Sequence, residues 1–438
     1  MSSQKNTATG RAFSMASMGA GIAGSYFGYL LQRVFLGEAK GKLKLKSTHV
    51  RAARRMADEM QALRGPAMKL GQMLSLQTGV LPDEILAELA TLQMEAPGMH
   101  PSLVRAQVKG SLGREPEEIF KEFTSKPFAA ASLGQVHHAI TREGRHVAVK
   151  IQYPGIRRAI ENDFSLFRTF SKPAQASGHI RKSAIDEIEE QIVAETDYLR
   201  EADNIEFLAD RLAPLSFVKA PRVFREYSSD KVLTMSLMTG RHLEDFLAQR
   251  PSQKVRNQMG AHLFELFHFQ VYEVEALHAD PHWGNYLFND DAGISLVDFG
   301  CVKYLSHEAA AYLRSVCLYP GSTGSAHFRR LLETYYEQVG EKLLPGARRA
   351  LINFAENFYR KVYPPKPDKD QLFDFSDAIF LRDFLRESKN LFRTKGVITE
   401  FIFMGRAEMG LYQTLHRLKA RVPTSQIVKK IFEETQVH

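Results

Sequence analysis

The spacing of hydrophobic positions predicts a helical region early in the chain. Between Arg51 and Ala96 apolar residues recur at intervals of three and four, the period of an amphipathic helix. Gly65-Pro66 interrupts the pattern, so we expect two helices there. The short loop Ala96-Pro97-Gly98 closes the region.

The pattern then changes to that of strands. Strand-like runs begin near Phe128 and continue through Gln135-Val136 and Val147-Ala148-Val149. Glu143-Gly144 supplies turn chemistry between the last two runs, which therefore predict a hairpin.

A long amphipathic helix is expected next, from Ser183 to about Leu212. Val223–Tyr227 and Val232–Leu237 read as two further strands, and beyond Gly240 the pattern is mostly helical. This order predicts an α+β protein of two lobes, with a small β-rich lobe before a larger helical one.

Composition agrees with a folded, multidomain protein. The 438 residues are 44% hydrophobic and 25% charged, close to globular averages. Cys301 and Cys317 are the two cysteines, too few for a disulfide framework, so we expect a reducing compartment. The net charge of +8 permits contact with anionic partners without choosing among them.

The first 55 residues point to a membrane. Ala12–Gln32 carries no charge, and its small residues recur every four positions, which suits close helix packing in a bilayer. Its glycines and serines favour a helix that lies on the membrane over one that spans it. Seven basic residues without an intervening acid follow, as expected at an anionic lipid surface: Lys40, Lys42, Lys44, Lys46, Arg51, Arg54 and Arg55.

The segment His278–Asn285 carries the strongest chemical signal. It fits the kinase catalytic loop H-x-D-x-x-x-x-N, and Asp298-Phe299-Gly300 fits the metal-binding D-F-G that follows in kinases. Asp280 would lie near the phosphoryl acceptor, while Asn285 and Asp298 would hold Mg²⁺. The run between them reads as a hairpin, so both elements are expected in one kinase-like C-lobe.

A rival interpretation of the same segment is a transition-metal site. His278, Asp280 and His282 alternate as ligands on a strand could. The Asp-Pro sequence would break such a strand, which favours the kinase interpretation.

Lys150 ends the run Val147–Lys150, which fits the V-A-I-K strand of kinases. Its partner should be a glutamate on the following helix, and Glu201 fits the helix pattern best. Glu195 and Asp197 are alternative partners.

The phosphate-binding loop departs from the kinase pattern. Ala129–Val136 falls on the frame G-x-G-x-x-G-x-V with alanine in place of the first two glycines. Alanine restricts the backbone where glycine would be free, so we expect nucleotide binding with altered handling of the γ-phosphate. The expected nucleotide-binding residues are Ala129, Ala130, Ala131, Ser132, Gly134, Val136 and Lys150.

Together these motifs resemble the UbiB/AarF family of atypical kinases. The resemblance rests also on Lys69-Leu70-Gly71-Gln72 as K-x-G-Q and on Glu195-Thr196-Asp197 as E-x-D. It implies a protein-kinase-like fold whose N-terminal extension packs over the cleft and brings Lys69 and Gln72 into the active site. Glu195 and Asp197 would then hold Lys69, leaving Glu201 to Lys150. Such an extension would block peptide substrates.

The resemblance also implies four parts and a function. Residues 1–46 would associate with a membrane, 47–126 form the helical extension, 127–240 the kinase-like N-lobe and 241–438 the C-lobe. The expected cofactors are ATP or ADP and Mg²⁺, and the expected activity is that of an atypical kinase or ATPase supporting ubiquinone biosynthesis.

Location, partners and rival functions remain expectations. We expect the cytoplasmic face of a bacterial inner membrane, or else the mitochondrial inner membrane. The expected partners are anionic lipids and quinone precursors or their biosynthetic enzymes, with no nucleic acid, because no nucleic-acid module is recognisable. The alternatives are a small-molecule phosphotransferase and a nucleotide-gated scaffold.

Overall fold

A computed structural model describes most of the chain after residue 98. The expected membrane segment, the K-x-G-Q residues Lys69 and Gln72, and Ser132 of the alanine-rich loop lie outside the described residues. The described ranges are 99–131, 133–162, 164–165, 168, 182–280, 283–317, 319–340, 342–364, 371–393 and 400–434.

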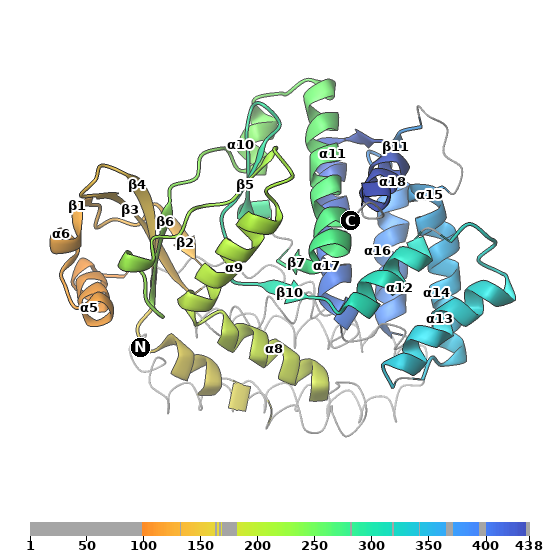
Figure 1. Ribbon diagram of the computed structural model, residues 1–438, viewed down its shortest axis with the longest axis horizontal. Coiled ribbons are helices and arrows are strands. Elements are labelled where there is room, and N and C mark those ends of the chain that lie inside the picture. Colours follow the sequence, from red (N-terminus) through yellow and green to blue (C-terminus); the bar gives the residue numbers. More distant parts are fainter. Residues whose placement is uncertain are drawn as a thin grey trace, which may run out of the picture. The chain divides into compact units, whose positions relative to one another are not determined.

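The chain divides into two compact units (Figure 1). The first contains residues up to Ala202 together with Val223–Leu237, and we call it the N-lobe. The second contains Asp203–Arg222 and Met238 onward, and we call it the C-lobe.

The N-lobe is built on an antiparallel sheet with strand order β1-β3-β4-β6, and β2 pairs with β3. Its strands are β1 (Phe120–Phe123), β2 (Ala129–Ala131), β3 (Gly134–Thr141), β4 (His146–Gln152) and β6 (Val232–Ser236). Helices α5 (Pro101–Leu112) and α6 (Pro116–Ile119) precede the sheet in the chain. The sequence predicted only helices before residue 127, whereas β1 adds a strand there.

The register of β3 against β4 determines which side chains of this lobe share a face of the sheet. Gly134 faces Gln152, Val136 faces Lys150 and Ile140 faces His146. Because side chains alternate between the faces of a sheet, Lys150, Ala148 and His146 share one face of β4. The opposite face of β4 supplies Val147, Val149 and Ile151 to the buried core beneath α5.

Two predictions about this lobe were wrong. The expected long helix is two helices, α8 (Lys182–Ala194) and α9 (Tyr198–Arg211), separated at Glu195–Asp197. The Asp197 carboxylate accepts a hydrogen bond from the backbone N–H of Leu199, as side chains that start a helix do. A new helix therefore begins where the apolar spacing alone had suggested continuity.

The expected strand Val223–Tyr227 is also absent. Val223 makes an isolated bridge to Met235, and Arg225–Tyr227 is a short 3₁₀ helix, η2. The Ser228 hydroxyl donates to the carbonyl of Phe224, which holds the chain in a turn where a strand would have to stay extended.

The C-lobe is mostly helical, and α11 and α17 pack against each other within it (Figure 1). Its longer helices are α10 (Leu243–Ala248), α11 (Gln253–Phe269), α12 (His307–Cys317), α13 (Ala326–Gln338), α14 (Pro345–Phe354), α16 (Ala378–Arg393), α17 (Glu400–Leu418) and α18 (Thr424–Glu434). Its shorter helical segments are η3 (Gln270–Val274), η4 (Trp283–Asn285), η5 (Ala355–Tyr359) and α15 (Arg360–Val362).

Short strands in the C-lobe position the catalytic motifs. β7 (Ala276–His278) pairs with β10 (Val302–Tyr304), and β8 (Tyr286–Phe288) forms the predicted hairpin with β9 (Ile294–Leu296). β5 (Val218–Lys219) adds to that hairpin, and β11 (Phe373–Asp374) pairs with β12 (Arg421–Val422).

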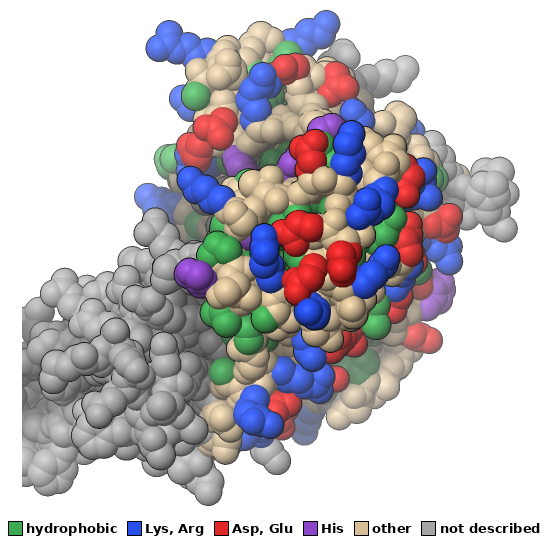
Figure 2. Space-filling view, turned by 90° about the vertical axis from the view of Figure 1, so that its left-hand side faces the viewer, with side chains coloured by type: hydrophobic (Ala, Val, Ile, Leu, Met, Phe, Trp, Pro, Cys, Tyr) green, Lys and Arg blue, Asp and Glu red, His purple; other side chains and the backbone are tan. Residues whose placement is uncertain are grey.

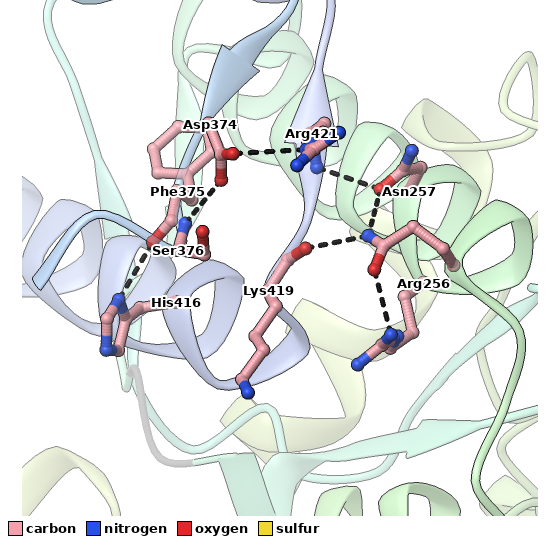
Figure 3. A network of polar contacts seen from close by, with 9 residues as sticks. Arg256, Asn257, Asp374, Phe375, Ser376, His416, Lys419 and Arg421 are labelled. Carbon is pink, nitrogen blue, oxygen red and sulfur yellow. Dashed lines mark hydrogen bonds and ion pairs between the residues drawn. The ribbon is translucent and has the colours of Figure 1, made fainter.

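A polar network fastens the end of α17 to the start of α11 (Figure 3). Gln253 donates to the carbonyl of Lys419 at 2.8 Å, and Asn257 accepts from the backbone N–H of Arg421 at 2.9 Å. Arg421 in turn pairs with Asp374 of β11 at 3.1 Å. These contacts fix the position of α17, which carries a residue of the candidate site.

Among the described residues, none of the helices combines the length and the apolar character that crossing a bilayer requires.

Candidate active site

Lys150 and Glu201 form a buried ion pair within the N-lobe. The lysine Nζ lies 2.8 Å from both carboxylate oxygens of Glu201, and their side chains are only 5% and 2% exposed. The Tyr198 ring lies 5.1 Å from the same Nζ and adds a cation–π contact. Of the three acids that the sequence offered as partners, Glu201 on α9 makes this contact. The catalytic role of the pair stays a prediction.

The E-x-D residues lie in the break between α8 and α9. Glu195 is 6% exposed, and Asp197 is half-buried at the start of α9. Their expected partner Lys69 lies outside the described residues, so the proposed contact stays a prediction.

The alanine-rich loop begins as a strand. Ala129, Ala130 and Ala131 form β2 and face Val136, Gln135 and Gly134 of β3. A Cβ built on Gly134 would lie 2.2 Å from the carbonyl oxygen of Ile151. Glycine is therefore required at Gly134 for packing against β4, whereas alanine is accommodated at the other two glycine positions of the frame.

The C-lobe carries the catalytic-loop and D-F-G residues. β7 ends at His278, whose backbone N–H donates to the buried side chain of Gln270 in η3 at 2.7 Å. Asp280 follows two residues later, with a side chain 26% exposed. Pairing of β7 with β10 continues as a 2.9 Å hydrogen bond from Ala279 to the carbonyl of Cys301. The two motifs therefore run side by side.

Hydrogen bonds and burial fix the segment Asp298-Phe299-Gly300. The His278 Nε2 bonds to the carbonyl of Asp298, and the Asp298 carboxylate accepts from the N–H of Gly300 at 3.0 Å. Phe299 is fully buried, and its carbonyl accepts from the Asn204 side chain at 3.0 Å. Phe299 is thus a packing residue.

The donor set fits a hard divalent cation. Asn285 directs its Nδ2 toward the carbonyl of Asp280 at 3.4 Å, which leaves the amide oxygen as the group to offer a metal. Asp298 supplies a half-buried carboxylate.

Tyr286 lies near these residues and stays neutral. Burial, with a smaller effect of the Asp280 carboxylate, raises the pKa of Tyr286 well above its usual value.

The rival transition-metal site stays untested, because one of its three expected ligands lies outside the described residues. The described residues contain no cluster of three or more His, Cys, Asp or Glu side chains suited to a metal. His282 lies outside them, and the Nε2 of His278 is already bonded to the Asp298 carbonyl.

Sequence reasoning missed Arg406. This residue of α17 is 5% exposed at the side chain, and its Nη2 lies 3.6 Å from the Asp280 carboxylate. Its Nε and Nη1 are buried without a hydrogen-bond partner. The available signal was an arginine, with Glu408, inside an otherwise uncharged stretch of the helix pattern, Phe401–Leu411.

Comparison with known proteins identifies the family. Residues 91–320 match the model of the ABC1 atypical kinase-like domain, which is just over half of the chain. The chain is 30% identical over 285 residues to mouse AarF domain-containing protein kinase 1, and 28% identical over 387 residues to the mitochondrial atypical kinase COQ8 of Saccharomyces cerevisiae.

The coverage of these relatives is partial. The alignments span 64% of this chain and 54% of the mouse protein, and 86% of this chain and 75% of the yeast protein. A solved structure described as the complex of Rv3197 with erythromycin, from Mycobacterium tuberculosis, matches with a TM-score of 0.59 at 23% identity. That match covers 84% of this chain and 92% of the other, and it shows the fold alone. The chain has a kinase-like fold and belongs to the ABC1 atypical kinase-like family, which includes AarF-type and COQ8 kinases.

Proposed function

We propose that this protein binds Mg²⁺-nucleotide and transfers or hydrolyses the terminal phosphoryl group, in support of ubiquinone biosynthesis at a membrane. The observation that carries the proposal is the buried Lys150–Glu201 pair. Desolvating two charges is costly, and a buried pair is weak evidence for stability. A lysine held in this way is, however, the group that kinases place against the nucleotide phosphates.

Each candidate residue of the C-lobe has a chemical role in the proposal. Asn285 and Asp298 would hold Mg²⁺, which supplies charge neutralisation at the phosphates. Asp280 would orient the acceptor and take its proton, and Arg406 would hold the Asp280 carboxylate in place. Positioning and charge stabilisation account for most catalysis in phosphoryl transfer, so no covalent residue is required.

A protein substrate is disfavoured by the chain after Gly300. β10 begins at Val302 and α12 already begins at His307, where conventional kinases have a long activation segment and an A-P-E motif. A peptide platform is therefore missing from this part of the chain. A small molecule or water is the better acceptor.

The ubiquinone part of the proposal rests on the relatives, and the membrane part rests on the distribution of charge along the chain. The yeast relative is named COQ8. Residues 1–98 contain twelve basic and seven acidic residues, so most of the net charge of +8 resides there. On the face drawn in Figure 2, basic and acidic side chains are interspersed without a large patch of one sign. The charge count therefore favours the N-terminal segment as the part that would recognise an anionic lipid surface.

The test is nucleotide turnover by the full chain with and without anionic liposomes. Stimulation by anionic but not neutral liposomes is the result we expect. Turnover that depends on a soluble acceptor and ignores lipid would support the small-molecule phosphotransferase. Tight binding with no turnover under any condition would support the nucleotide-gated scaffold and overturn the proposal.

A further inference from the structure

Two histidines that have no role in the proposed function face each other on the N-lobe sheet. The His138 Nε2 lies 3.1 Å from the His146 Nδ1, and their ring centroids are 5.2 Å apart. His138 faces Ala148 and His146 faces Ile140, so the pair is diagonal across β3 and β4 on one face of the sheet. His146 is exposed and His138 is half-buried.

The separation of the two nitrogens is that of neighbouring ligands on one metal ion. With metal–nitrogen bonds of about 2.0–2.1 Å, two imidazole nitrogens lie about 2.9 Å apart at a right angle and about 3.4 Å apart at the tetrahedral angle. The observed 3.1 Å falls between these values. The distance between the nitrogens would therefore change by only tenths of an ångström on binding an ion, while the rings would turn so that both lone pairs point at it.

The protonation of the two rings also allows a metal ion to replace the hydrogen between them. In the metal-free pair one nitrogen must donate its hydrogen to the other, because both lone pairs cannot face each other favourably. A metal ion replaces that shared hydrogen and takes both lone pairs. The displaced proton moves to the other nitrogen of the same ring, so both imidazoles stay neutral when they bind the ion.

We infer that His138 and His146 form a two-histidine clamp for a divalent transition ion, Cu²⁺, Ni²⁺ or Zn²⁺, with water in its remaining positions. Imidazole suits these ions, and Cu²⁺ should bind most tightly of the three. No third protein ligand of the His, Cys, Asp or Glu type completes the set among the described residues, so the ion should exchange rapidly.

The clamp is distinct from Lys150 and differs in its ligands from the proposed Mg²⁺ site. It lies on the face of β4 that carries Lys150, but His146 and Lys150 are four residues apart, about 13 Å along an extended strand. Its nitrogen ligands also differ in kind from the oxygen ligands Asn285 and Asp298. Transition ions bound at the clamp should therefore coexist with Mg²⁺.

The test is Cu²⁺ binding to the full chain, followed by electron paramagnetic resonance and by competition with a coloured chelator. The spectrum should show two coordinated nitrogens, and either His138→Ala or His146→Ala should weaken binding by about tenfold or more, because half of the protein ligands is lost. The exposed His242, which precedes α10, gives the matched control, and His242→Ala should bind as the parent does.

Two further measurements keep the result interpretable. Thermal unfolding without metal should be nearly the same for parent and variants, since the pair lies at the surface, while Cu²⁺ should stabilise only proteins that retain both histidines. Asp298→Asn should leave the Cu²⁺ site intact whether or not the protein turns over nucleotide. Equal binding by His138→Ala, His146→Ala and parent would overturn the clamp, as would loss of binding in Asp298→Asn.

Discussion

The guanidinium of Arg406 lies against the carboxylate of Asp280, with Nη2 3.6 Å from Oδ1. The two residues are 126 positions apart in the sequence and meet because α17 packs along α11, whose continuation through η3 leads into β7. A cation that is 5% exposed depends on this carboxylate for its charge balance. The proposed catalytic aspartate is thus also part of the packing of α17.

Asp280→Asn should therefore destabilise the protein as well as impair turnover. Leaving the buried Arg406 without its charge partner should cost about 3 kcal/mol in the free energy of unfolding. Arg406→Met should relieve much of that cost in the double variant, so urea unfolding should show non-additive effects. Arg421→Met is the control, because the exposed Arg421–Asp374 pair should contribute less than about 1 kcal/mol. Additive effects of the first two changes would refute the coupling.

The alanine-rich loop should restrain handling of the γ-phosphate. Ala129→Gly and Ala131→Gly each restore part of the glycine frame and loosen β2, which pairs with β3 through these residues. The affinity ratio of ATP to ADP, measured by calorimetric titration, should shift in both variants. If both variants keep the parent's ratio, the loop does not control this preference.

A buried acid lies two residues after Arg406 on α17. Burial raises the pKa of Glu408 to about 7, and a hydrogen bond from Tyr412 offsets part of the rise. Its neighbours stay neutral near that pH, since burial raises the pKa of Cys317 to about 12 and lowers that of His268 to about 4. Glu408 is then the group of this cluster that titrates near neutral pH.

Stability should fall as pH rises through the range in which Glu408 titrates. The unfolded chain releases this proton near the ordinary glutamate pKa of 4.5 and the folded protein near 7, so between these two pH values the folded protein keeps a proton that the unfolded chain has lost. The loss should be complete above about pH 7 and amount to roughly 3 kcal/mol. Glu408→Gln should remove this component, gaining stability relative to the parent between pH 5 and pH 8. Parallel pH profiles of unfolding for the two proteins would show that Glu408 does not titrate as described.

The N-terminal segment should be the membrane anchor. A truncation starting near Ser47 removes the uncharged stretch and four of the seven basic residues, and should lose most binding to anionic liposomes while still binding nucleotide. Electrostatic attachment should weaken as salt rises, since the Debye length is about 8 Å at physiological salt. Co-sedimentation with liposomes measures both effects. Undiminished binding by the truncated protein would place the anchor on the folded lobes.

Local motifs made part of the site predictable. Lys150 ends an apolar strand and Glu201 follows on a helix, so periodicity favoured this pair, while Glu195 and Asp197 stayed open as alternatives until the structure showed the contact. The hairpin between Asn285 and Asp298 was predictable for the same reason, because short apolar runs flank a turn there.

Other features depended on contacts that local patterns do not encode. The break at Glu195–Asp197 was missed because apolar spacing continues through it, while a side chain to backbone bond starts the new helix. Arg406 was missed because its partner lies far away in sequence. β1 was missed because its pairing with β3, and not its own pattern, makes it a strand.

Titration of Mg²⁺-ATP into the parent and Asp298→Asn, followed by thermal stabilisation, tests the central claim most directly. If Asp298 holds the metal that bridges the phosphates, the parent should be stabilised by ATP far more with Mg²⁺ than without it. The variant should lose that dependence on Mg²⁺. Equal Mg²⁺-ATP stabilisation of the two proteins would contradict the assignment of this site.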